Sequence, residues 1–174
     1  MKTFGVALSF VLCLAAAALA AGDKFTADNP SPLKLARPAA GDGSAVRFTG
    51  TVGISGRFVA AWEGLNRKPR YLRVTFLAND DSAALLPHVA GAAAVKELIL
   101  TNIDEAATLL LGSEAAARLL AKDVMSAEGA ATVTIGDYRT VVECDQRWYM
   151  ARLITVTTSR DVVAAAGGGR RAGC

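Results

Sequence analysis

The sequence predicts a mainly β domain of the α+β class, a small antiparallel β-barrel with a helical insertion before its last strands. Apolar and polar residues alternate with period two in several segments, which is typical of half-buried antiparallel strands. Between these segments, residues 102–124 have the alanine- and leucine-rich composition of helices. The chain has 174 residues, enough for one domain with its own hydrophobic core.

The N-terminus has the pattern of an export signal. A short basic start precedes an apolar run, and Ala18-Leu19-Ala20 supplies the small residues of a cleavage site. We therefore expect residues 1–20 to be a cleaved signal peptide, which implies a bacterial periplasmic or secreted protein without a membrane span after cleavage. The alternative is a retained N-terminal anchor, because the uncharged stretch approaches the length of a span.

Two segments flanking the domain have the composition of irregular chain. Residues 21–44 are rich in proline, glycine and alanine, and we expect a flexible linker there. The domain itself is expected over residues 45–158, and the Ala-, Gly- and Arg-containing residues 159–174 predict a disordered tail. After signal cleavage Cys144 and Cys174 remain. An oxidising compartment permits a disulfide between them, and the alternative is a packed Cys144 with a terminal thiol open to another chain.

The first half of the domain contains four strand patterns. They lie at residues 46–52, 57–62, 70–77 and 97–101. Gly53 and Gly56 between the first two indicate either a bulge in one long strand or a hairpin between two strands. Residues 79–82 have turn composition and precede a short helical turn that Pro87 ends.

The second half begins with helix and ends with strands. Asn102 and Glu105 have the spacing of a capping box, and Gly112 divides the helical segment into a hairpin or a kinked helix. A meander then follows, with strands at 132–135, 138–144 and 147–158 and tight turns at 136–137 and 145–146.

This order of strands, helix and final strands is similar to that of the OB-fold, a small and partly open barrel. Over residues 45–158 the chain resembles small secreted bacterial OB-fold-like domains of unknown function. The resemblance is carried by an opening strand at 46–50 and a glycine-led strand pair at 129–156. It implies a barrel fold and transfers no functional residues.

Motifs of metal and phosphate chemistry are absent from the sequence. It contains no HExxH, no paired CxxC, no Walker lysine loop and no GxGxxG after a strand. His88 is the single histidine, expected in a loop or partly buried, and its isolation excludes mechanisms that need two histidines. We therefore predict no metal, no other cofactor and no catalytic residue. The less favoured alternative is a carboxylate-dependent hydrolase, with candidate pairs Asp80–Asp81, Asp104–Glu105 and Glu143–Asp145.

Basic and aromatic residues cluster on two groups of predicted strands. The candidate ligand- or partner-binding residues are Arg57, Arg70, Tyr71, Arg73, Trp148 and Tyr149, with Arg139, Arg147 and Arg152 nearby in sequence. Such residues dominate interface hot spots and suit anionic ligands, although strand arginines also line solvated faces.

The charge balance narrows the ligand class. A net charge of +3 and the export signal both argue against a nucleic-acid ligand. We therefore expect a non-enzymatic binding domain that engages a protein or an anionic envelope polymer. A periplasmic inhibitor or immunity-type protein fits the same observations.

Overall fold

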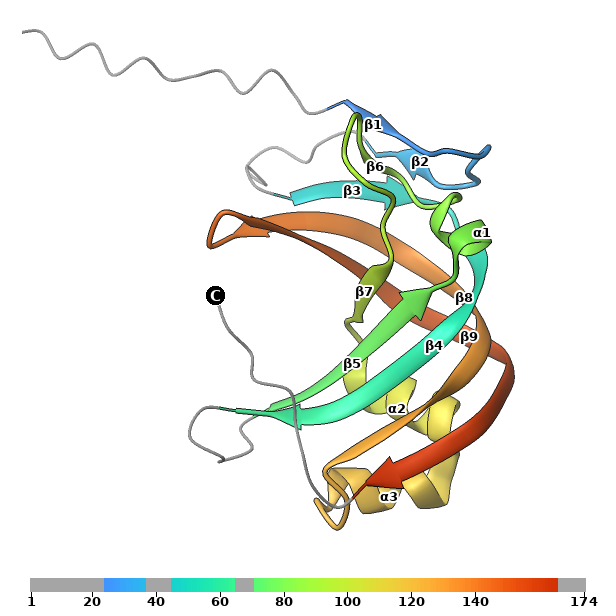
Figure 1. Ribbon diagram of the computed structural model, residues 1–174, viewed down its shortest axis with the longest axis vertical. Coiled ribbons are helices and arrows are strands. Elements are labelled where there is room, and N and C mark those ends of the chain that lie inside the picture. Colours follow the sequence, from blue (N-terminus) through green and yellow to red (C-terminus); the bar gives the residue numbers. More distant parts are fainter. Residues whose placement is uncertain (1–23, 37–44, 65–70, 166–174) are drawn as a thin grey trace, which may run out of the picture.

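A curved sheet closes into a barrel in the computed structural model, which describes residues 24–36, 45–64 and 71–165 (Figure 1). The barrel strands, in order of pairing, are β4 (Val52–Glu63), β5 (Tyr71–Ala78), β7 (Glu97–Leu100), β9 (Gln146–Ala165) and β8 (Ser126–Glu143). β8 returns to pair with β4, and β7 pairs with β9 in parallel, whereas the other barrel pairs are antiparallel. The predicted fold class, a small OB-like barrel with a helical insertion, is confirmed.

One side of each barrel strand forms the core. The largest side chains on this side include Phe58, Phe76, Leu98 and Leu153, all with 0% exposure. Gly53 and Gly56 lie within the single strand β4, so no hairpin turn forms at these glycines. The chain is not one long strand either, because a separate strand over Ala45–Thr49 ends before Gly50, whose φ is 99°.

Two helices close the barrel end nearest the lower part of Figure 1, α2 (Ile103–Leu111) and α3 (Ser113–Leu120). Gly112 separates them with a φ of 80°, a conformation that favours glycine. The indole Nε1 of Trp62 donates a 2.7 Å hydrogen bond to the Leu119 carbonyl, which fixes α3 against β4. The predicted break at Gly112 is therefore present as a boundary between two helices.

Asn102 is the N-cap residue of α2, as predicted, and its side-chain N–H donates to Glu105 Oε2 at 2.8 Å, but the backbone hydrogen bond of a capping box is absent. The Asn102 side chain makes no cap hydrogen bond to α2. Its amide instead donates to the Leu153 carbonyl at 2.8 Å and accepts from the Leu153 N–H at 2.9 Å. The side chain thus continues the β7–β9 ladder beyond the end of β7, a role that helix-capping patterns do not reveal.

The predicted turn at residues 136–137 is also wrong, because β8 runs through it as one bent strand. The register against β9 shifts between Gly136 and Arg139, and Asp137 has a φ of 48°. These are features of a β-bulge. The actual β8–β9 turn is centred on Cys144 and Asp145, whose φ values are 50° and 57°.

The bulge leads directly into a buried aromatic cluster. Tyr138 has 0% exposure, and its hydroxyl donates a 2.6 Å hydrogen bond to the Pro87 carbonyl. Burial raises the pKa of this hydroxyl, and the neighbouring Tyr149 adds to the effect. The ring packs against Phe48, whose ring centroid is 5.3 Å away.

The segment expected to be a linker contributes short strands within its described part. β1 (Phe25–Thr26) pairs with β6 (His88–Val89), and β2 (Lys34–Leu35) pairs with β3 (Ala45–Thr49). The linker prediction is therefore wrong for residues 24–36, because Phe25 and Leu33 pack against the barrel core.

The C-terminal boundary also differs from the prediction. β9 remains paired with β8 as far as Ala165, so the tail does not begin at residue 159. The predicted signal peptide, residues 1–20, and the end of the expected tail, residues 166–174, lie outside the described residues. None of the described helices has the length and apolar composition needed to cross a membrane.

A short helix follows β5. α1 (Asp80–Ala83) is capped by Asn79, whose side-chain oxygen accepts a 3.0 Å hydrogen bond from the Ser82 N–H. The Ser82 hydroxyl in turn accepts from the Ser55 N–H at 2.8 Å, so this turn is attached to β4.

The two glycines of β4 provide a matched test of the fold. A Cβ at Gly56 would overlap the Leu77 carbonyl oxygen, whereas a Cβ at Gly53 would meet nothing within 4 Å. Gly56→Ala should lower the free energy of unfolding by about 1–3 kcal/mol, the usual cost of overpacking. Gly53→Ala should be neutral or slightly stabilising. Urea denaturation measures both, and equal effects of the two variants would contradict the close approach of β4 and β5.

Candidate functional site

Arg73 lies between two aromatic rings that come from different strands. Its guanidinium carbon is 5.8 Å from the ring centroid of Tyr71 and 5.6 Å from that of Trp148. We call these three residues the aromatic clamp. Tyr71 and Arg73 belong to β5, Trp148 belongs to β9, and β7 pairs with both strands. In Figure 1 the β8–β9 hairpin and the β4–β5 ends project on either side of β7, so the clamp links these two projections.

Glu63 forms an ion pair with the Arg73 guanidinium. Its Oε2 lies 3.2 Å from Arg73 Nε, and Glu63 is only 7% exposed. This oxygen has no hydrogen bond of acceptable geometry among the described residues, so the contact is an ion pair without a well-aligned N–H. Because a buried carboxylate needs a compensating charge, Glu63 strongly constrains the position of Arg73.

A row of paired residues crosses the outer face of the sheet beside the clamp. The printed register of each strand pair places these residues next to one another in the order Thr75, Ile99, Met150, Arg139 and Arg47. Residues paired in this way share one face of a sheet. Their sequence neighbours, such as Phe76 and Tyr138, point into the core. The row therefore lies on the same outer face as Arg73.

The row changes from apolar to cationic along its length. Ile99 and Met150 are partly buried at its centre, and Arg139 and Arg47 stand directly opposite each other at its β8–β3 end. Arg139 is partly buried and has no ion pair with any described residue. A partly buried guanidinium without a counter-charge favours an anionic partner, so Arg139 makes this end of the face suited to an anion.

A small recess adjoins the row. Its volume is about 230 Å³, and it is bounded by the segment before β7 and by Trp148 and Ile99. Ala93, Ala94 and Val95 supply most of the first wall. Lys96, Glu97, Arg147 and Tyr149 complete its lining, so the hollow combines small apolar side chains with charged ones.

Three of the six predicted binding residues meet in this site. Tyr71, Arg73 and Trp148 form the clamp. Arg57 is elsewhere, in an exposed ion pair with Glu128 of β8 at 3.3 Å. Tyr149 points to the opposite side of β9 and stacks on Tyr138 at 6.2 Å, because adjacent residues of a strand face opposite ways. Arg70 lies outside the described residues.

Glu63 and Ile99 belong to this site and were not among the predicted residues. Glu63 could not be predicted from the sequence, because its role depends on the pairing of Glu63 in β4 with Tyr71 in β5. Ile99 lies in a short apolar run whose strand neighbours cannot be read from local alternation. A correct strand order would have placed both residues beside Arg73.

One member of each of two candidate carboxylate pairs has a cationic partner. Lys96 binds Asp80 at 2.8 Å, and this hydrogen bond and the lysine charge lower the pKa of Asp80. Glu105 forms a 3.0 Å ion pair with Arg152. The lowered pKa of Asp80 is the opposite of the raised pKa expected of a general acid. The third pair, Glu143 and Asp145, is exposed at the β8–β9 turn.

His88 is more buried than the sequence predicted. It is 3% exposed in β6, with Nδ1 3.2 Å from the Leu86 carbonyl and Nε2 3.7 Å from Asp28. Among described residues, no group of three or more His, Cys, Asp or Glu side chains could hold a metal ion. Cys144 is exposed, and its predicted disulfide partner Cys174 lies outside the described residues.

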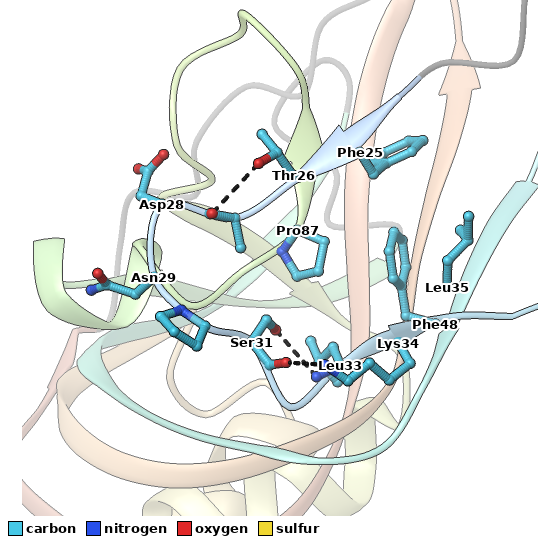
Figure 2. A pocket seen from close by; sticks show the side chains of 12 residues that line it. Phe25, Thr26, Asp28, Asn29, Ser31, Leu33, Lys34, Leu35, Phe48 and Pro87 are labelled. Atoms are coloured by element: carbon cyan, nitrogen blue, oxygen red, sulfur yellow. Dashed lines mark hydrogen bonds between the residues drawn. The ribbon is translucent and has the colours of Figure 1, made fainter.

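A larger hollow lies under the N-terminal strands and has a different character. Figure 2 shows Phe25, Leu35 and Phe48 at one end and Asp28 and Asn29 at the other. Its volume is about 480 Å³. Several of its polar groups bind one another, as when the Ser31 hydroxyl accepts a 3.1 Å hydrogen bond from the Leu33 N–H. The hollow has no convergent charged groups comparable to those of the clamp face.

Comparison with known proteins gives no match: no family model, no curated protein and no solved structure matches the chain. The site is therefore interpreted from its own residues.

The Glu63–Arg73 pair can be tested by a double-mutant cycle. Arg73→Met leaves a buried carboxylate uncompensated and should lower the free energy of unfolding by about 3 kcal/mol. Adding Glu63→Gln removes that charge and should restore most of the loss. Denaturant unfolding of the two single variants and the double variant measures the coupling. Additive effects would show that the two side chains are independent.

Proposed function

We propose that this chain is an exported, non-enzymatic bacterial binding domain and that it binds an anionic ligand on the outer face of β5, β7 and β9. The observation that carries the proposal is the position of Arg139. It is partly buried, directly opposite Arg47, and without an ion pair in the described part of the chain. A ligand anion at this position would pair with the Arg139 guanidinium, which no carboxylate of the described residues neutralises.

The aromatic clamp supports the same ligand class. Only Nε of Arg73 faces Glu63, and the described contacts leave its two terminal nitrogens available as donors. A guanidinium presents its N–H groups in a planar fork that matches carboxylate and phosphate oxygens. Stacking on Tyr71 and Trp148 holds that plane in place, which reduces the entropy lost on binding.

The position of the face within the barrel also supports a binding role. OB-folds carry oligonucleotides and oligosaccharides on the face of their second and third strands and on the adjoining loops. β5 and β7 are the second and third barrel strands along this chain. This support is an analogy of architecture, and the ligand class is argued from the arginines. The export signal favours an extracytoplasmic protein or envelope polymer over nucleic acid.

Replacement of Arg139 tests the proposal with a matched control. Arg139→Gln should weaken binding of polygalacturonate, used as a carboxylate-rich probe, roughly tenfold, because a charge-assisted hydrogen bond contributes about 1.5–3 kcal/mol. Its free energy of unfolding should change by less than about 0.5 kcal/mol, because Arg139 has no ion pair with the described residues to lose.

Arg160→Gln is the matched control. It makes the same charge change on the exposed C-terminal half of β9, ten residues from Met150. It should leave probe binding unchanged in isothermal titration calorimetry at low salt. Equal weakening by both substitutions would indicate unspecific charge attraction and would contradict the proposed face.

A further inference from the structure

We infer that the anionic ligand is an extended acidic segment of another protein, in which two carboxylate side chains lie on either side of an apolar one. This inference rests on the proposed function and adds the chemical class of the ligand. It follows from three properties of the clamp face: its apolar floor, the separation of its arginines and the shape of the recess.

The floor between the arginines is apolar. Ile99 and Met150 occupy the centre of the row, and neither side chain offers a hydrogen-bond donor or strong acceptor. A sugar placed there would lose water from its hydroxyl groups without gaining partners, which is unfavourable. An aliphatic side chain would gain contacts, and methionine adapts well to such partners. The floor therefore favours a protein segment over a polysaccharide.

The recess provides a place for that apolar side chain. Ile99 and Trp148 form one boundary, and Ala93, Ala94 and Val95 lie across from them. Its volume is about 230 Å³. Lys96, Glu97, Arg147 and Tyr149 complete the lining, so the part between Ile99, Trp148 and the alanines is the one that suits an apolar side chain. Small wall residues allow close approach of such a side chain.

The strand spacing limits the distance between the two carboxylates. β5, which carries Arg73, and β8, which carries Arg139, are three strand steps apart through β7 and β9. Three steps of about 4.8 Å, together with the two-residue offset of Arg73 from Thr75 along β5, give roughly 16 Å between the strand positions. An extended peptide rises about 3.3 Å per residue, so four residues span roughly 13 Å and the long arginine side chains cover the remaining distance. Because side chains alternate in an extended chain, acidic residues at positions i and i+4 and an apolar residue at i+2 point the same way.

Charge complementarity assigns the ends of the segment. One carboxylate meets the terminal nitrogens of Arg73, and the other meets Arg139 beside Arg47. Both arginines lie at the rim of the apolar floor, which is the usual arrangement of a protein interface with an apolar centre and a polar rim. Arginine, tyrosine and tryptophan are also the residues most enriched at interface hot spots.

A peptide series tests this inference without altering the protein. The probe is an acetylated, amidated and fluorescently labelled peptide containing Glu-Ser-Leu-Ser-Glu. One control replaces leucine by serine, and a second moves leucine next to the first glutamate, which turns it to the other side of an extended chain. Fluorescence anisotropy should give at least fivefold tighter binding for the first peptide than for either control. Equal affinities would overturn the inference.

Protein variants and other ligand classes complete the test. Met150→Gln should abolish the preference for leucine, and thermal unfolding shows whether the variant is folded. If the variant is unfolded, the peptide series with the unaltered protein still tests the inference of a protein ligand. Polygalacturonate or single-stranded oligothymidine could bind more tightly than the first peptide in a manner that depends on Arg139. That result would overturn the inference of a protein ligand, and the proposal of an anion-binding face would stand. Absence of binding by every probe overturns both proposals.

Discussion

The bulge in β8 is the constraint on which the binding face depends. Before the bulge, Val133 and Ile135 point into the core, and after it Tyr138 and Thr140 do so. The extra residue therefore exchanges the two sides of the strand, because the side-chain period of a strand is two. Without this exchange Tyr138 would face outward and Arg139 would enter the core. The same irregularity produces both the aromatic cluster and the cationic end of the face.

The aromatic cluster then fixes the hairpin that carries Trp148. Tyr138 packs with Phe48 and stacks with Tyr149, and its hydroxyl binds the Pro87 carbonyl. Phe25 of the N-terminal segment covers Phe48 with a ring-to-ring distance of 5.4 Å. Because Trp148 and Tyr149 are consecutive, anchoring Tyr149 on the core side holds Trp148 on the outer side. The N-terminal strands thereby contribute to the site without touching the clamp.

Local patterns were sufficient for the barrel and insufficient for the site. The alternation of Leu72, Val74 and Phe76 predicts a half-buried strand, and this strand is present as β5. Features that depend on distant partners were not predictable in this way. Asn102 is the N-cap residue of α2 as predicted, but its contact with Leu153, 51 positions away along the chain, cannot be predicted from local spacing. Gly136 and Asp137 resemble a turn because the same residue types also form bulges.

In the candidate site, too, residues of one strand were predicted together, whereas residues brought together by strand pairing were not. Tyr71 and Arg73 were predicted together because both lie on one side of a single strand. Arg57 was grouped with them by proximity in sequence, yet its partner Glu128 lies on the other neighbour of β4. Glu63 and Ile99 join the site only through strand pairing. The sequence therefore identified the types of residue on the face, whereas the strand order was needed to show which residues belong to it.

The two tryptophans offer the most direct test of the account. Trp62 is held by its hydrogen bond to Leu119, under the helices, whereas Trp148 lies in the proposed binding face. In ¹H–¹⁵N spectra, titration with polygalacturonate should shift the indole N–H signal of Trp148 and leave that of Trp62 in place. Trp62→Phe identifies the two signals. A shift confined to Trp62, or equal shifts of both signals, would contradict a ligand face on β5, β7 and β9.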